Sequence, residues 1–84
     1  MKNKVLVELI VPELEESYDI YIPVDKKVGS VVKLLNKAIF ELSDGGYNGG
    51  EKSFIYNRDN GVRYDINQII KETDIRNGTK IILI

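Results

Sequence analysis

Two hydrophobic segments near the start of the chain predict a pair of β-strands. The first, residues 5–11, is rich in β-branched residues and ends at Pro12, which has no N–H to donate to a sheet. In the second, residues 18–22, apolar and polar residues alternate as far as Pro23. The polar connection between the two segments is short, so we expect the strands to pair as an antiparallel hairpin.

The hydrophobic period then changes from two residues to 3.6, which predicts a helix over residues 28–42. Apolar side chains at helical spacing form one face of this segment: Val28, Val31, Val32, Leu35, Ala38, Ile39 and Leu42. We expect Asp25 to cap the start of the helix, although Gly29 weakens the first turn. The Asp-Gly-Gly sequence at 44–46 is expected to end it.

Apolar segments separated by turn residues predict three short strands in the second half of the chain: residues 53–57, 62–64 and 80–84. A helical turn fits between the last two, with Ile66, Ile69 and Ile70 directed inward.

One helix covers only one face of a sheet, so these elements predict an α+β roll. Its mixed sheet has four to five strands, and the single main helix packs on one face. A parallel central pair made of the first and last strands satisfies the length and handedness rules for crossover connections. A chain of 84 residues has material for one hydrophobic core, so we expect a single domain over residues 1–84.

Composition removes several classes of function. The chain has 12 Lys and Arg against 13 Asp and Glu, and this balance argues against nucleic-acid binding, which needs a surplus of cations. Neither Cys nor His is present, which removes thiolate chemistry, zinc–thiolate sites and the commonest general base. No pair of carboxylates stands out as an acid–base couple. We therefore expect a non-enzyme without catalytic, cofactor-binding or metal-binding residues.

The apolar segment at residues 5–11 includes Glu8 and is too short for a signal peptide or a membrane span. A small chain without cysteine also fits the cytosol. We therefore expect a soluble, cytoplasmic protein that does not insert directly into a membrane.

The order of the predicted elements is that of the ubiquitin-like β-grasp. Two segments, residues 17–23 and 69–84, resemble the YukD/EsaB family, the small ubiquitin-like proteins encoded with bacterial type VII secretion systems. In the second segment, Ile75 precedes an Asn-Gly turn at Gly78, and an apolar strand at 81–84 closes the chain, as in the family. The resemblance implies a cytoplasmic accessory or regulatory protein that binds a protein partner in membrane-embedded secretion machinery and lies at the periphery of that complex.

The last strand indicates where such a partner binds. Residues 81–84 are apolar on both faces of the expected sheet, so if Ile81 faces the helix, Ile82 faces the open side. The expected open-face neighbours are Leu6, Ile10, Ile55, Ile82 and Ile84, with Phe54 and Tyr56 pointing inward. We favour a protein-binding patch, because an uncovered apolar cluster usually marks an interface. The alternative is a strand rich in isoleucine from β-propensity alone, with its outer face shielded by long side chains.

A Gly-rich segment at 44–50 carries a second hypothesis. It lacks the Gly-Lys-Ser/Thr sequence and the following helix of a phosphate-binding loop, so a mobile connection is favoured. The alternative is a flexible contact loop anchored by its tyrosine: Gly45, Gly46, Tyr47, Gly49 and Gly50.

Two alternatives to the accessory role remain open. Ubiquitin and the sulfur carriers of the same fold act through an exposed C-terminal Gly-Gly, whereas this chain stops at Ile84 and its Gly-Gly pairs are internal. Conjugation is therefore not expected, unless the chain is a covalent modifier or sulfur carrier that lacks its tail here. The other alternative is a self-associating structural module, a homodimer formed through the apolar face.

Overall fold

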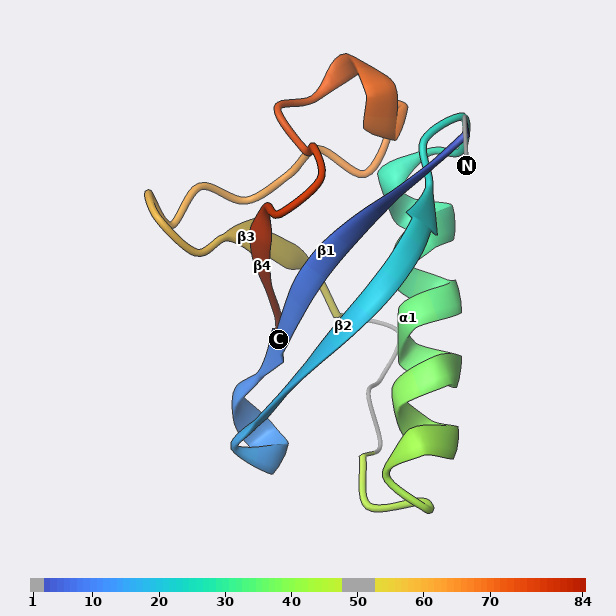
Figure 1. The fold of residues 1–84 in the computed structure, drawn as a ribbon, viewed down its shortest axis with the longest axis vertical. Helices are drawn as coiled ribbons and strands as arrows, with labels where there is room; N and C mark the ends of the chain where they lie inside the picture. The colour runs from blue at the N-terminus through green and yellow to red at the C-terminus, as the bar shows by residue number, and fades with distance from the viewer. Residues whose placement is uncertain (1–2, 48–52) are drawn as a thin grey trace.

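A computed structural model describes residues 3–47 and 53–84 of the protein. Its elements, in chain order, are β1 (Lys4–Val11), a 3₁₀ turn (Pro12–Leu14), β2 (Glu16–Pro23), α1 (Val28–Leu42), β3 (Ile55–Asn57), a second 3₁₀ turn (Ile70–Glu72) and β4 (Lys80–Leu83). Figure 1 shows α1 as the main helix, lying along one side of the sheet, while a long connection from β3 to β4 extends at one end of the molecule.

The strands form one four-stranded sheet in the order β2-β1-β4-β3. β1 pairs antiparallel with β2 and parallel with β4, and β3 pairs antiparallel with β4. The hairpin, the parallel central pair and the single helix on one face are those expected from the sequence. The α+β roll with a mixed sheet is therefore confirmed, with four strands.

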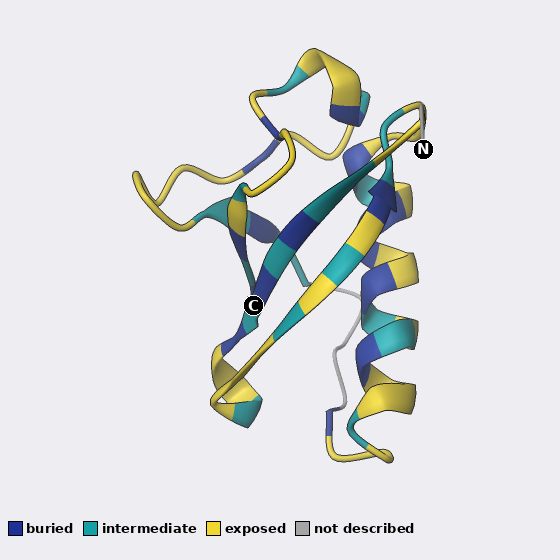
Figure 2. Ribbon diagram, in the orientation of Figure 1, coloured by how far each residue is buried: buried dark blue, intermediate teal, exposed yellow. Residues whose placement is uncertain are grey.

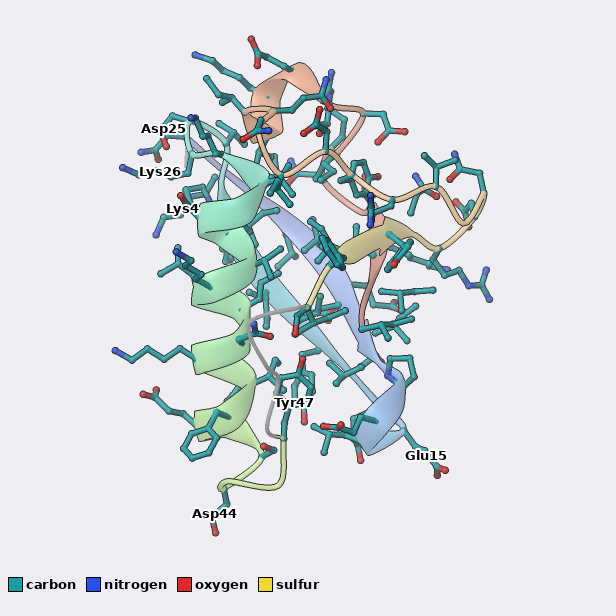
Figure 3. The ribbon with its side chains drawn as sticks, turned by 180° about the vertical axis from the view of Figure 1, so that it is seen from behind. Lys4, Glu15, Asp25, Lys26, Asp44 and Tyr47 are labelled. Atoms are coloured by element: carbon teal, nitrogen blue, oxygen red, sulfur yellow. The ribbon has the colours of Figure 1, made fainter. Side chains whose placement is uncertain are left out.

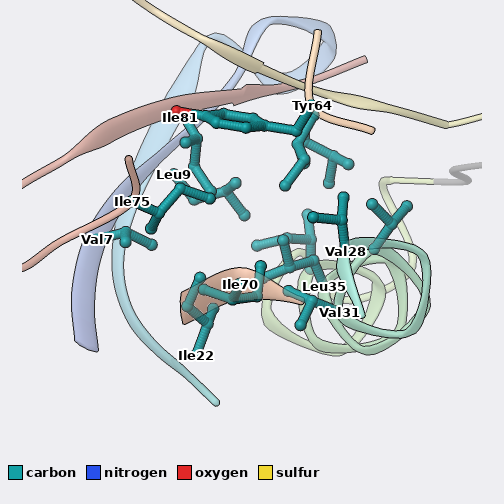
Figure 4. Packing of buried hydrophobic residues seen from close by; sticks show 14 of the residues in the cluster. Val7, Leu9, Ile22, Val28, Val31, Leu35, Tyr64, Ile70, Ile75 and Ile81 are labelled. Carbon is teal, nitrogen blue, oxygen red and sulfur yellow. The ribbon is translucent and has the colours of Figure 1, made fainter. Parts of the chain in front are cut away.

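The hydrophobic core lies between α1 and the inner face of the sheet. Burial alternates along β1 and follows one side of α1 (Figure 2), as the periods of two and 3.6 residues predict. Fully buried side chains from separate elements meet there (Figure 4), including Leu9, Ile22, Leu35, Ile70, Ile75 and Ile81. Each such side chain contributes about 1.5–3 kcal/mol through removal from water.

The start of α1 is capped differently from the prediction. Asp25 does not cap the helix: the N-cap position is Lys27, and no side chain caps it. Instead, the Val28 N–H donates to the Gln68 carbonyl (2.8 Å) and the Gly29 N–H donates to the Ile66 carbonyl (3.0 Å). Two of the donors that the first helical turn leaves unpaired are therefore satisfied by backbone from the β3–β4 connection.

Two predictions for the β3–β4 connection are wrong. Residues 62–64 form no strand, because only an isolated bridge between Arg63 and Tyr56 joins them to β3. The helical turn within 66–72 is limited to Ile70–Glu72, and Ile66 is 46% exposed and not directed into the core. Ile70 does lie in the core, as expected.

Tyr64 fastens this connection to the sheet. Its hydroxyl donates to Asp74 Oδ1 (2.7 Å) and accepts from Asn57 Nδ2 (3.1 Å), so it joins three separate segments. Burial of the ring, together with the hydrogen bond to Asp74, raises the pKa of Tyr64 to about 12. The hydroxyl therefore holds its proton in the folded state.

Candidate protein-binding face

The sheet face opposite α1 carries a row of side chains that the strand registers place side by side. Ser17 pairs with Ile10, Ile10 with Ile82, and Ile82 with Tyr56. Directly paired residues of neighbouring strands point to the same face, so this row crosses all four strands. Three adjacent members, Ile10, Ile82 and Tyr56, are apolar or aromatic and half-buried.

A second pair, Phe54 and Ile84, lies beside the row, just beyond the end of β4. The Phe54 N–H donates to the Ile84 carbonyl (2.8 Å) and the Ile84 N–H donates back to Phe54 (3.1 Å), so these residues lie directly opposite each other. The guanidinium of Arg63 lies over the Phe54 ring, 4.5 Å from its centroid. We call the five residues that meet here the open-face patch: Ile10, Phe54, Tyr56, Ile82 and Ile84.

The predicted site residues separate into two groups. Ile10 and Ile82 are direct neighbours, and Ile84 follows on the same face with 64% of its surface exposed. Leu6 is on the same face, as predicted, but lies outside the patch: its N–H donates to Asn77 Oδ1 (2.8 Å), and Glu8 separates it from Ile10. Whether these residues bind a partner stays a prediction.

The placement of Ile55 on the open face is wrong. Ile55 is fully buried and pairs with Leu83, which faces the core. The sequence analysis placed Phe54 and Tyr56 inward, whereas the register with β4 directs Ile55 inward. Phe54 and Tyr56 therefore occupy the open face, together with Arg63, and sequence reasoning missed all three. The inward residues of β4 were expected correctly. Pairing β3 antiparallel with β4 in this register would have identified Phe54 and Tyr56 as open-face residues.

Tyr47 cannot serve as the exposed anchor of a contact loop. It is 3% exposed, its hydroxyl donates to Asn36 Oδ1 on α1 (3.0 Å), and its N–H donates to Ser43 Oγ (2.9 Å). Figure 3 shows Tyr47 just after the turn that ends α1. Gly45 and Gly46 are exposed within that turn, and Gly45 has φ +82°, a conformation that favours glycine. Gly49 and Gly50 lie outside the described residues.

Charged residues form a second row across the same face. Asp19 pairs with Glu8 and Glu8 pairs with Lys80, while the Arg58 N–H donates to the Lys80 carbonyl (3.0 Å). The acidic pair lies on β2 and β1, and the basic pair lies on β4 and at the end of β3. The one ion pair recorded for residues 3–47 and 53–84 is between Arg58 and Asp59, at 3.6 Å with both side chains largely exposed.

A recess of about 420 Å³ borders the patch, lined by Phe54, Arg63, Tyr64, Asp65 and Ile66. The described part of the chain contains no group of acidic residues arranged to hold a metal ion. It also contains no helix of the length and apolar character needed to cross a membrane. The site is thus an aromatic and aliphatic surface with a recess at its border, suited to holding side chains of another protein.

Comparisons with known proteins identify the fold. No protein-family model matches the sequence, and no curated protein does either. Among solved structures, the ubiquitin-like domain of the Mycobacterium tuberculosis type VII secretion system protein ECCD1 superposes with a TM-score of 0.74 at 9% identity, over 96% of this chain and 97% of that one. The N-terminal ubiquitin-like domain of the 4931431F19Rik protein gives a TM-score of 0.75 at 11% identity, over 98% of this chain and 74% of that one.

A chain of the MycP5-free ESX-5 inner membrane complex gives a TM-score of 0.71 at 16% identity. The match covers 96% of this chain but 20% of that one, so it concerns one part of a much longer protein. At these identities the likeness establishes the fold, and the chain has the ubiquitin-like β-grasp fold expected from its element order.

Proposed function

We propose that this ubiquitin-like protein is a non-enzymatic, non-conjugated accessory protein of a bacterial type VII secretion system, and that it acts by binding another protein through the open-face patch. The observation that carries the proposal is the patch itself. Five apolar or aromatic residues adjoin one another on the sheet face that α1 leaves uncovered. Contiguous apolar surface of this kind on a small protein usually marks an interaction site.

The composition of the patch supports protein binding. Tyrosine and arginine are among the residues that contribute most to the affinity of protein interfaces. Tyr56 lies at the β3 end of the four-strand row, beside Ile82, and Arg63 is already held in place over Phe54. Holding the Arg63 side chain in place before binding lowers the entropy lost on association. The recess beside Phe54 offers space for an apolar side chain of the partner.

The choice of a secretion system rests on two likenesses. The sequence resembles the YukD/EsaB family over residues 17–23 and 69–84. The fold is similar to the ubiquitin-like domain of a mycobacterial type VII secretion protein and to part of a chain in the ESX-5 inner membrane complex. The partner we propose is therefore a component of membrane-embedded secretion machinery, bound from the cytoplasm at the periphery of the complex.

Affinity capture from detergent-solubilised lysate of the source organism tests the proposal. We expect the wild-type protein to retain secretion components and Ile82→Lys to lose them, because the lysine places a charge at the centre of the patch. Leu34→Lys is the matched control: Leu34 is 54% exposed on α1, away from the sheet face. It should retain the same proteins as the wild type.

Two results would contradict the proposal in different ways. If wild type, Ile82→Lys and Leu34→Lys retain equal amounts of secretion components, the open-face patch is not the binding site. Absence of every secretion component from the wild-type sample would remove the secretion role and leave the ubiquitin-like fold unaffected. Circular dichroism of each purified variant establishes that the fold is retained before the capture is interpreted.

A further inference from the structure

The charged row on the open face is complementary to itself. Across the strand order β2-β1-β4-β3, its register positions are Asp19, Glu8, Lys80 and Arg58, so the sign changes once, between β1 and β4. The neighbouring row has Ile10 on β1 and Ile82 on β4, on either side of the same line. The acidic and basic halves of the charged row therefore meet beside an apolar centre formed by Ile10 and Ile82.

Consider a second copy stacked on the open face and related to the first by a two-fold axis. The axis runs parallel to the strands, above the boundary between β1 and β4. The β2–β1 half of each copy then faces the β4–β3 half of the other. Glu8 then faces Lys80 of the second copy, and Lys80 faces its Glu8. The same rotation places Ile10 over Ile82 and Ser17 over Tyr56. Two sheets that pack face to face lie about 10 Å apart, a distance that side chains of this size fill.

We propose that the protein forms a symmetric homodimer through its open sheet face, with Ile10 and Ile82 of the open-face patch at its centre and the charged row paired in reverse order across the two-fold axis. A two-fold interface uses the same surface on both subunits, so it requires a surface complementary to itself. The single change of sign along the charged row meets this requirement, whereas a row of one charge would repel a second copy.

The dimer goes beyond the proposed binding of a secretion partner and does not depend on it. Both associations use the open-face patch, so a dimeric molecule has no patch available for another protein. Dimerisation would therefore compete with partner binding, and the protein concentration would determine how much of the patch is accessible.

Sedimentation equilibrium of the purified protein tests the dimer. We expect the apparent mass to rise with concentration from the 9.6 kDa of one chain towards twice that value. We also expect the dimer to weaken when NaCl is raised, because salt screens exposed charge pairs. A wild-type protein that stays at the mass of one chain up to millimolar concentration would overturn the proposal.

Charge reversal on either half provides the decisive comparison. Glu8→Lys with Asp19→Lys makes the row entirely basic, and Arg58→Glu with Lys80→Glu makes it entirely acidic. Each double variant alone should dimerise at least tenfold more weakly than the wild type. Lys33→Glu with Lys37→Glu, at exposed positions of α1, changes the net charge as much as the acidic variant and should dimerise like the wild type.

Mixing the two reversed variants in equal amounts should restore a dimer, because every pair across the axis is again of opposite sign. Loss of fold in either variant cannot produce this recovery. Failure of the mixture to dimerise, or wild-type dimerisation by each variant alone, would overturn the proposed interface. Should a double variant not fold, Glu8→Lys and Lys80→Glu allow the same mixing test, since these two positions face each other directly. Because only purified protein is used, these outcomes are independent of whether a secretion component binds.

Discussion

At the scale of single residues, the hydroxyl of Tyr64 and the side chain of Ile55 show how the β3 region is held to the rest of the fold. The Tyr64 hydroxyl bonds Asp74 and Asn57, which lie on opposite sides of it in the sequence. Ile55 enters the core while the residues on either side of it face outward. The three-residue strand β3 therefore depends on a few well-placed contacts and on little regular pairing.

Tyr64→Phe should destabilise the protein by about 1 kcal/mol, the usual net value of a hydrogen bond. The pKa of Tyr64 rises from 10.0 to about 12 on folding, so the protonated hydroxyl favours the folded state. This contribution is complete below pH 10 and is lost as the pH rises through about 12. Urea unfolding between pH 7 and pH 11 should show a decline for the wild type that is smaller in Tyr64→Phe. Equal declines in both proteins would show that Tyr64 does not contribute to this pH dependence.

Ile55→Ala should cost about 2–5 kcal/mol, because it removes a fully buried side chain and leaves a cavity. Ile82→Ala provides the matched control at a half-buried position of the open face, and it should cost less. Urea denaturation measures both differences. A larger loss from Ile82→Ala than from Ile55→Ala would contradict the assignment of Ile55 to the core and Ile82 to the open face.

At the scale of elements, the features set by local pattern were predictable from the sequence and those set by distant partners were not. The helix and the β1–β2 hairpin follow from the periods of 3.6 and two residues, and both were expected within a residue or two. The cap of α1 could not be predicted from local sequence, because its acceptors are the carbonyls of Ile66 and Gln68, far along the chain. The prediction of which β3 residues face inward was wrong for the same reason. In so short a strand, the register with β4 decides which residues face inward.

For the candidate site, too, the residues on strands with a clear hydrophobic pattern were predictable and those around β3 were not. Ile10, Ile82 and Ile84 belong to strands with clear patterns, and their face was identified correctly. Phe54 and Tyr56 were expected to point inward, because nothing local in so short a segment shows which of its two faces meets the core. Arg63 reaches the face through the bridge to Tyr56, which is all that forms of the strand predicted at residues 62–64.

The docking of the β3–β4 connection on the start of α1 makes a prediction for Gly29. A Cβ at this position would lie 3.3 Å from the Ile66 carbonyl oxygen, so there is little space for a side chain. We expect Gly29→Val to destabilise the protein by about 1–3 kcal/mol through displacement of that carbonyl. Ser30→Val introduces the same side chain at the next, exposed position and should change stability little. Thermal unfolding compares them, and equal melting temperatures would contradict the close contact.

At the scale of the whole molecule, the two faces of the sheet have different roles. One face packs against α1 and provides the core, and the other presents the open-face patch and the charged row. Because the two sets of side chains alternate along the same strands, surface changes such as Ile82→Lys can be made without altering the residues that form the core. The binding and dimer experiments rely on this separation.

The parallel pairing of β1 with β4 also affects how the protein is made. Glu8 lies opposite Lys80, so the centre of the sheet joins residues from the beginning and the end of the described sequence. During synthesis the β1–β2 hairpin leaves the ribosome long before β4, and until then β1 has an unpaired edge at the future centre of the sheet. A nascent chain without residues 80–83 cannot complete that centre, and the apolar residues of β1 remain open to incorrect pairing until β4 has been made.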